Sequence, residues 1–323
     1  MGGSDRVLAI DLGGTNLRAA VVASDGDLQH RRAVPTPSSG GPTAIIDQMA
    51  LLIEDVAAAA SLPPSAPVGV TAPGPLNPRA GVVRFAPNLP DWQDVPLRDL
   101  LAAASHRPVA IGNDGNCAAL GEARFGAGKG YADLVYLALG TGVGGGVING
   151  GRLVDGMHGL GAELGHVVVA LDGPRCSCGA IGCLEAFVGG WAIAREGRLV
   201  ASTVDGAAML KEAGDRSITA SVVAAAARGG DPAALAILGR AGRALGAAMG
   251  AFVNIFNPAL IVVGGGVAAL GDLLLAPARS AFPSHCFPAS REHVAIVQSL
   301  LGDDTGLYGA AAVALDLQES IQR

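Results

Sequence analysis

The sequence predicts an α/β protein with two domains. At 323 residues the chain exceeds the usual size of a single domain, and 50% of it is hydrophobic, which is enough for two cores. Short apolar strands alternate with segments of helical periodicity, which is the pattern of an α/β fold. Polar residues gather where several of these strands end, and these positions are the first candidates for a functional site.

In the first third of the chain, two predicted strands end at an aspartate. "RVLAI" runs into Asp11, and the turn "DLGGTN" connects it to a second strand, "LRAAVVAS", as a hairpin. A third strand, "LQHRRAVPTP", precedes a helix over 43–60, for which Thr43 is the expected N-cap. The strands "APVGVTAPGP" and "RPVAIGND" follow, and the latter ends at Asp114. Ligands of open α/β sheets bind beyond the carboxyl ends of strands, so Asp11 and Asp114 are both candidate ligand-binding residues.

The second part of the chain begins with the same pattern of strand, glycine turn with threonine, and strand, in "LVYLALGTGVGGGVI". A long helix over 231–256 follows, with Asp231 as N-cap and Pro232 in its first turn. "PALIVVGGGV" adds a strand and a third glycine turn, "HVAIVQS" a late strand, and "LYGAAAVALDLQES" a closing helix. We expect a smaller lobe of residues 1–115 completed by the helix 307–323, and a larger lobe of residues 116–306.

The three glycine turns favour phosphate binding. Backbone N–H groups at glycine turns approach a phosphate closely, and a threonine hydroxyl adds a donor. With 48 glycines in the chain, any single turn is more simply a hairpin, but three turns that each follow a strand favour phosphate. They match neither the Walker pattern nor the dinucleotide fingerprint.

Asp114 in "GNDGNCAALGEA" has two interpretations. It lies between a strand and an alanine-rich helix, where aspartate is a favoured N-cap. It is also placed to act as a general base that accepts a hydroxyl proton. Taken alone, this motif favours the cap.

The segment "CSCGAIGCLE" predicts a structural zinc site. Cys176, Cys178 and Cys183, with His166 ten positions upstream, supply a complete tetrahedral ligand set. A filled set leaves no open position for water, which disfavours a zinc hydrolase; free thiols are the minority alternative. The zinc would also bring Glu163 and Glu185 close together, in apolar surroundings where a carboxylate generally has a partner. The two other cysteines, 117 and 286, are expected to be buried small hydrophobes.

Charge and hydropathy limit the partners. The net charge is −6 and no segment concentrates basic residues, which argues against nucleic-acid binding. The longest apolar run is interrupted by Asn254, Asn257 and Pro258, and the N-terminus lacks the pattern of a signal peptide. We expect a cytoplasmic protein without a membrane segment.

Together these motifs resemble the ROK family over nearly the whole chain. The zinc segment is the most specific of them. In the family's order they are "DLGGTNLR", "TAPGPL", "APNLPDW", "GNDGNCAALGEA", "LGTGVGGGVINGG", "GLGAELGH", "CSCGAIGCLE" and "PALIVVGGGV". The resemblance implies a two-lobed, actin-like ATPase (ribonuclease H-like) sugar kinase fold with a central cleft.

The resemblance also implies roles for individual residues. The nucleotide, its phosphates and Mg²⁺ would be served by Asp11, Gly13, Gly14, Thr15, Thr141, Gly142, Gly264, Gly265 and Gly266. The sugar hydroxyls would be bound by Asn88, Asn113, Asp114, Glu163, His166 and Glu185, with Asp114 as general base. One ring nitrogen of His166 would bind the structural zinc while the other faces the sugar. Asn16 stands where many relatives have lysine, and we assign it no function.

The activity that the resemblance implies is phosphoryl transfer from ATP, with Mg²⁺, to the 6-OH of glucose. "FVGGWAIARE" resembles the glucokinase-like members, but it does not determine the sugar. Fructose, mannose and N-acetylated hexosamines stay open as acceptors, and polyphosphate stays open as a donor. A sugar-sensing repressor is disfavoured because little sequence precedes Asp11 for a helix-turn-helix. The family is commonly dimeric or tetrameric, so a homodimer or homotetramer is expected.

Overall fold

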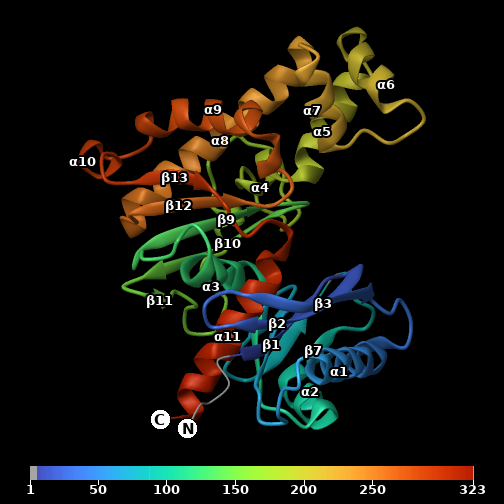
Figure 1. Ribbon diagram of the computed structural model, residues 1–323. Coiled ribbons are helices and arrows are strands. Elements are labelled where there is room, and N and C mark those ends of the chain that lie inside the picture. The colour runs from blue at the N-terminus through green and yellow to red at the C-terminus, as the bar shows by residue number, and fades with distance from the viewer. Residues whose placement is uncertain (1–5, 87, 323) are drawn as a thin grey trace. The chain divides into compact units, whose positions relative to one another are not determined.

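The computed structural model describes residues 6–86 and 88–322, which form two compact units (Figure 1). Unit 1 comprises residues up to 132, residues 146–162 and residues from 300 onward, and unit 2 comprises residues 133–145 and 163–299. By this division, residues 116–132, 146–162 and 300–306, which were expected in the larger lobe, group with unit 1. The first five residues of the expected smaller lobe lie outside the described part.

Unit 1 is built on a mixed five-stranded sheet with the order β3-β2-β1-β4-β8. The first three strands form antiparallel hairpins, whereas β1, β4 and β8 are parallel. The strands are β1 (Arg6–Leu12), β2 (Asn16–Ala23), β3 (Leu28–Pro35), β4 (Val68–Ala72) and β8 (Val109–Asn113). A small antiparallel sheet contains β5 (Leu76–Asn77), β6 (Val82–Phe85) and β7 (Gln93–Val95), and β10 continues from unit 2 to pair with β11 (Arg152–Leu153).

The side chains of β1 alternate between the two faces of this sheet, and both faces are buried. Leu8 and Ile10 belong to the core shared with helices α1 (Gly41–Ala59) and α2 (Leu97–Ser105). Val7 and Ala9 pack on the other face against α11 (Thr305–Ile321), the C-terminal helix, which also contacts α3 (Asp114–Phe125). The period of two along a strand explains why consecutive residues serve opposite cores.

The start of α1 corrects one expectation from the sequence. The helix begins at Gly41, so Thr43 lies inside its first turn and is not the N-cap. Gly40 takes the capping position with φ 86°, a left-handed conformation that glycine adopts without strain. Pro42 in the first turn suits this start, because its missing N–H would have no helical partner there.

Unit 2 contains the parallel strands β9 (Leu134–Leu139), β12 (Leu260–Gly264) and β13 (Ala295–Gln298), together with the start of β10 (Val143–Asn149). Its longest helix, α8 (Pro232–Phe256), is capped as the sequence predicts: Ala234 N–H donates to Asp231 Oδ1 over 2.7 Å. The other helices are α4 (Glu185–Val188), α5 (Gly190–Ala201), α6 (Ala207–Ala213), α7 (Ala220–Arg228), α9 (Asp272–Ala281) and α10 (Pro288–Arg291). Short 3₁₀ turns are η1 (Leu164–His166), η2 (Val204–Gly206), η3 (Ala268–Leu270), η4 (Phe282–Ser284) and, in unit 1, η5 (Gly302–Asp304).

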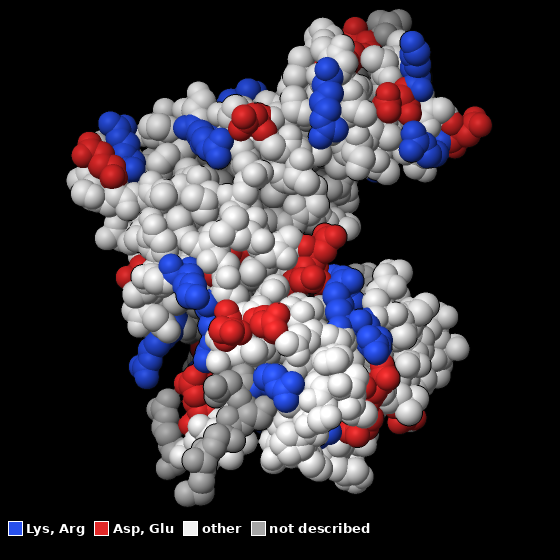
Figure 2. Space-filling view, in the orientation of Figure 1, with Lys and Arg blue, Asp and Glu red and all other residues white. Residues whose placement is uncertain are grey.

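The surface carries charges of both signs. On the face in Figure 2, basic and acidic side chains of the described residues are interspersed, and many lie side by side. Among the ion pairs of the described residues are Arg32 with Asp55 and Arg124 with Glu319. In the described chain no single helix is both long and apolar enough to cross a membrane; α7 and α8 meet the two criteria only together, as a pair bent by 119°.

Candidate active site

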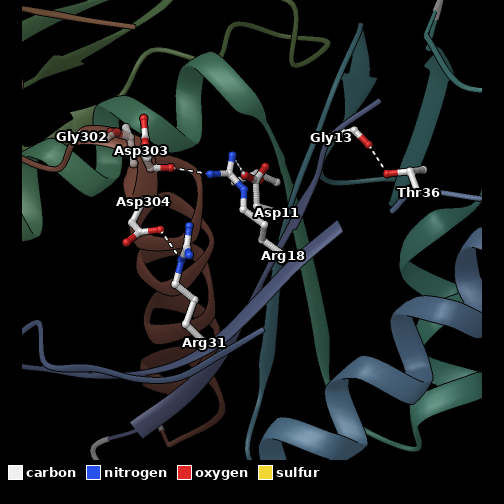
Figure 3. Close-up of polar contacts among 10 residues, drawn as sticks. Asp11, Gly13, Arg18, Arg31, Thr36, Gly302, Asp303 and Asp304 are labelled. Carbon is white, nitrogen blue, oxygen red and sulfur yellow. Dashed lines mark hydrogen bonds and ion pairs between the residues drawn. The ribbon is translucent and has the colours of Figure 1, made fainter. Parts of the chain in front are cut away.

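The carboxylate of Asp11 lies at the carboxyl end of β1, and each of its two oxygens has a partner within unit 1 (Figure 3). The residue is 8% exposed. Thr71 Oγ1, at the end of the neighbouring strand β4, donates to Asp11 Oδ1 over 2.9 Å, and Arg18 pairs with Oδ2 at 2.6 Å. A Cβ on Gly306, near the start of α11, would lie 2.6 Å from this carboxyl group, so the acid sits against a helix N-terminus. A helix N-terminus, a hydroxyl and a guanidinium therefore all adjoin this carboxyl group.

Arg18 was missed by the sequence analysis. It also donates to the backbone oxygen of Asp303 over 2.5 Å, which links β2 to the segment that opens α11 (Figure 3). Arg31 on β3 makes a similar link to Asp304 at 2.8 Å. A signal was present: in the β1–β2 hairpin, position 18 is directly opposite position 11. Opposite charges at paired positions of a hairpin interact across the strands.

The glycine turn after Asp11 is tightly packed. Gly13 N–H donates to the oxygen of Asn16 over 3.1 Å, and Thr36 Oγ1 donates to the oxygen of Gly13 over 2.6 Å. A Cβ on Gly14 would lie 2.9 Å from Asn88 Cβ, so a larger residue does not fit there. Asn88, expected to bind the sugar, therefore lies directly against the expected phosphate turn. Gly14, Thr15 and Asn88 are all exposed.

Asn113, and not Asp114, is the side-chain cap of α3. Its Oδ1 accepts from the N–H groups of Gly115 at 3.0 Å and Asn116 at 3.4 Å, and its Nδ2 donates to the oxygen of Gly74 at 3.1 Å. The preference for Asp114 as the cap was therefore wrong. Asp114 is the first residue of the helix and is exposed. Its Oδ1 accepts from Gly115 N–H at 2.8 Å, and the general-base role of Asp114 stays a prediction.

The parallel strands place these groups at one edge of the unit 1 sheet. Asp11 pairs in register with Thr71 of β4, and the next residue of β4, Ala72, pairs with Asn113 of β8. Asp11 is the penultimate residue of β1 and Asp114 directly follows β8, so both lie at the carboxyl ends of strands, as expected.

The second and third glycine turns come together in unit 2. The strands β9 and β12 are parallel, with Gly264 opposite Ala138, so the turns that follow them lie at the same edge of the sheet. Gly265 has φ 89°, and a Cβ there would lie 2.4 Å from the oxygen of Leu139. Only glycine permits both the conformation and this close contact.

A cavity of about 460 Å³ opens beside these two turns. Its glycine-turn side is formed by Gly140, Thr141 and Gly266, which include two expected nucleotide residues. The rest of the lining was missed by the sequence analysis; it comprises Gly190, Trp191, Ala194, Arg198, Ser217, Ile218, Thr219, Ala220, Ser221, Val267 and Leu270. The sequence gives little indication of a binding role for these residues. Thr219, for example, is recognisable only as the N-cap of α7, where its hydroxyl accepts from Val222 N–H at 3.3 Å.

His166, Cys176, Cys178 and Cys183 form one cluster in unit 2. Their ligand atoms all lie within 4.8 Å of one another. The sulfurs of Cys178 and Cys183 are 3.8 Å apart, and His166 Nδ1 is 3.7 Å from Cys176 Sγ. Two sulfurs at about 2.3 Å from a tetrahedral zinc ion are separated by about 3.8 Å, so both the donor set and its spacing fit zinc. By contrast, Cys117 and Cys286 are buried apart from this cluster, and burial raises the pKa of both thiols, as expected for structural cysteines.

Glu185 begins α4, two residues after Cys183, and is 8% exposed. Burial raises the pKa of its carboxyl, but donors outweigh burial and hold the pKa below its ordinary value. The donors are Ser177 Oγ at 2.7 Å and Trp191 Nε1 at 3.3 Å on Oε1, and Val143 N–H at 3.0 Å on Oε2. The carboxylate therefore joins the cysteine loop (residues 176–183), the β9–β10 turn (residues 140–143) and α5.

The last two expected sugar ligands are one turn apart. Glu163 is exposed and precedes η1, and His166 N–H donates to its backbone oxygen over 3.0 Å. Ala162 before them has φ 62°, which is unusual for a residue other than glycine and directs the chain into this turn. The turn places Glu163 close to His166, the expected zinc ligand, as the spacing predicts.

Comparison with known proteins identifies the family. The model of the ROK family matches residues 7–317. The chain belongs to the ROK family. Glucokinase of Thermotoga maritima is 38% identical over 309 residues, which are 95% of this chain and 96% of that protein.

Solved structures agree with this assignment. The crystal structure of a ROK hexokinase from Thermus thermophilus superposes with a TM-score of 0.83 at 33% identity, covering 97% of this chain and 99% of that one. A ROK family glucokinase from Streptomyces griseus, in complex with glucose and AMPPNP, gives a TM-score of 0.80 at 34% identity, covering 96% and 99%. The predicted actin-like ATPase fold of ROK sugar kinases is confirmed.

Proposed function

We propose that this ROK protein is an ATP-dependent glucokinase that phosphorylates the 6-OH of glucose. Glucose is the preferred acceptor because the chain is similar over nearly its whole length to the glucokinase of Thermotoga maritima and to the Streptomyces griseus glucokinase solved with glucose and AMPPNP. Fructose, mannose and N-acetylated hexosamines are the alternative acceptors.

The observation that carries the kinase proposal is the cavity of unit 2. It combines two glycine turns, which suit phosphates, with an apolar and hydroxyl-bearing wall formed by α5 and α7. A nucleotide needs both parts, because its base requires an enclosed surface and its phosphates require backbone donors. A polyphosphate donor would use only the turns, so the cavity favours ATP.

In this proposal the edge of the unit 1 sheet supplies the reacting groups. Asp114 accepts the proton of the attacking hydroxyl, and Asn113 holds the helix start that positions it. Asp11, buried beside Arg18, would hold Mg²⁺ directly or through water, and the ion would supply positive charge beside the transferred phosphoryl group. Gly13, Gly14 and Thr15 would face the phosphates. Because phosphoryl transfer depends mostly on positioning and charge neutralisation, a rigid and preorganised edge is what it requires.

Each unit carries some of the side chains that the resemblance assigns to the sugar: Asn88, Asn113 and Asp114 in unit 1, and Glu163, His166 and Glu185 in unit 2. The cysteine loop is proposed to bind zinc as a structural ion that fixes the His166 ring, so that its other nitrogen faces the sugar.

An acceptor and donor panel tests the proposal. The rates kcat/KM are measured for glucose, fructose, mannose, N-acetylglucosamine and N-acetylmannosamine, each with MgATP and with polyphosphate. Glucose with MgATP is expected to give the highest kcat/KM. A higher value for another sugar would reassign the acceptor, and a higher value with polyphosphate would reassign the donor.

A further inference from the structure

The β9–β10 turn, residues Gly140–Val143, is held by the segment that follows the cysteine loop. Gly190 N–H donates to the oxygen of Gly140 over 2.9 Å, and Trp191 N–H donates to the oxygen of Thr141 over 3.2 Å. Val143 N–H donates to Glu185 Oε2 over 3.0 Å. These three bonds bind both sides of the turn to residues 185–191, which start α4 and α5.

Glu185 is the only side chain among these three partners, and it is packed directly against the turn. A Cβ on Gly142 would lie 2.5 Å from Glu185 Oε2, so the carboxylate oxygen lies where any larger residue would place its side chain. A shift of this carboxylate would therefore change both the hydrogen bond from Val143 N–H and the packing beside Gly142.

The other oxygen of Glu185 is anchored in the cysteine loop. Ser177, which stands between Cys176 and Cys178, donates its hydroxyl to Oε1 over 2.7 Å, the shortest contact that this carboxylate makes. A second donor, Trp191 Nε1, is longer at 3.3 Å. Bonds to an ionised acceptor are stronger than neutral ones, and a buried carboxylate that loses its nearest donor shifts toward its remaining partners.

We propose that Ser177 and Glu185 are positioning residues that fix the Gly140–Val143 turn from the cysteine loop and thereby set the affinity for the nucleotide. Ser177 orients the Glu185 carboxylate, and the carboxylate holds the turn beside the unit 2 cavity. This inference rests on the proposed function, since it assigns the cavity to a nucleotide. It adds a donor-side role to a loop whose expected role concerns the sugar.

Calorimetric binding of the ATP analogue AMPPNP with Mg²⁺, without sugar, tests the inference. Ser177→Ala is expected to bind AMPPNP about tenfold more weakly than the wild type, with its zinc content and Tm retained. Ser177→Thr, which keeps a hydroxyl, and Ser202→Ala are expected to stay within twofold. Ser202 is the matched control because its hydroxyl also makes a 2.7 Å bond in unit 2, to Leu199, away from the turn. A Ser177→Ala affinity within twofold of the wild type would overturn the inference.

A double-mutant cycle with Gly142→Ala separates coupling from general damage. The added methyl group displaces Glu185 Oε2 from the turn without touching the cysteine loop. If both changes act through this one carboxylate, the double variant loses no more affinity than Gly142→Ala alone. Losses that multiply would show independent effects and contradict the inference.

Kinetic constants separate this inference from the proposed function. The KM for ATP is expected to rise about tenfold in Ser177→Ala while Tm stays at the wild-type value, whereas a purely structural role would lower Tm as well. A wild type that phosphorylates glucose, with a Ser177→Ala variant of unchanged AMPPNP affinity, would defeat the inference alone. A wild type that fails to phosphorylate glucose would defeat the proposed function, while the AMPPNP affinities would still decide the positioning role.

Discussion

The β1–β2 turn and the β9–β10 turn have the same plan but are stabilised in different ways. Each joins two antiparallel strands through glycines and one threonine. The first turn has its own acid, Asp11, inside the preceding strand, and Arg18 and Thr71 hold it from adjacent strands. The second has Leu139 at the end of its strand, and its carboxylate comes from Glu185, far away in the sequence.

This difference separates two tasks that the proposed reaction requires. A carboxylate embedded in the sheet gives a fixed negative charge, which suits a divalent cation. A carboxylate that accepts a backbone N–H of the turn fixes the shape of the turn through that hydrogen bond. Substitutions at the first turn are therefore expected to reduce activity by removing the negative charge of Asp11. Substitutions at the second turn are expected to reduce nucleotide affinity by changing the conformation of the turn.

The largest expected effect is the loss of catalysis when Asp114 of unit 1 is replaced. Asp114→Asn removes the proposed base, and we expect kcat to fall by about 10²- to 10⁴-fold. Because Asn113 supplies the cap of α3, the fold and the zinc content are expected to be unchanged, as read by circular dichroism and metal analysis. Near-normal kcat in this variant would remove Asp114 from the mechanism.

The next effect concerns the charge of the first turn. Asp11→Asn keeps an acceptor for Thr71 but removes the negative charge beside Arg18, and we expect kcat/KM to fall about 10²-fold with a higher Mg²⁺ requirement. Rates measured across a Mg²⁺ titration check this. Asp55→Asn, which breaks an exposed 2.9 Å pair with Arg32 in the same unit, is the control and should leave the rates unchanged. Equal behaviour of the two variants would contradict a special role for Asp11.

A smaller effect is expected from the zinc ligands of unit 2. Cys178→Ser should release zinc, because three ligands bind it less tightly than four, and weaken glucose binding about tenfold by freeing His166. Metal analysis and calorimetry with glucose measure the two results. A zinc-free variant with unchanged glucose affinity would refute the idea that the metal positions a sugar ligand.

The smallest effect is on stability alone. Asp231→Ala removes the 2.7 Å cap of α8 and should cost about 1 kcal/mol, which lowers Tm by about 2–4 °C. The KM values for ATP and for glucose should stay at the wild-type level, since this helix start does not line the unit 2 cavity. A kinetic change without a change in Tm would show that α8 acts on the site directly.

Much of the fold and the site could be predicted because their signals are local. Apolar runs that end at Asp11, and the spacing of Cys176, Cys178 and Cys183, do not depend on the rest of the chain. The cap of α3 was misassigned because Asn113 and Asp114 are both good caps, and only the backbone conformation at position 113, with φ −65° and ψ 144°, distinguishes them. The partners of Glu185 could not be predicted, because they bring together residues 143, 177 and 191 through long-range packing. Arg18 was predictable in principle from the hairpin register.

Direct identification of the product tests the central claim, that this chain phosphorylates glucose with ATP. The wild-type protein is incubated with glucose and MgATP, and the products are followed by phosphorus NMR. We predict the resonance of glucose 6-phosphate, formed in equal amount to ADP, with far slower ADP formation when glucose is omitted. Formation of ADP at the same rate without glucose, or no glucose 6-phosphate at millimolar concentrations of both substrates, would contradict the account.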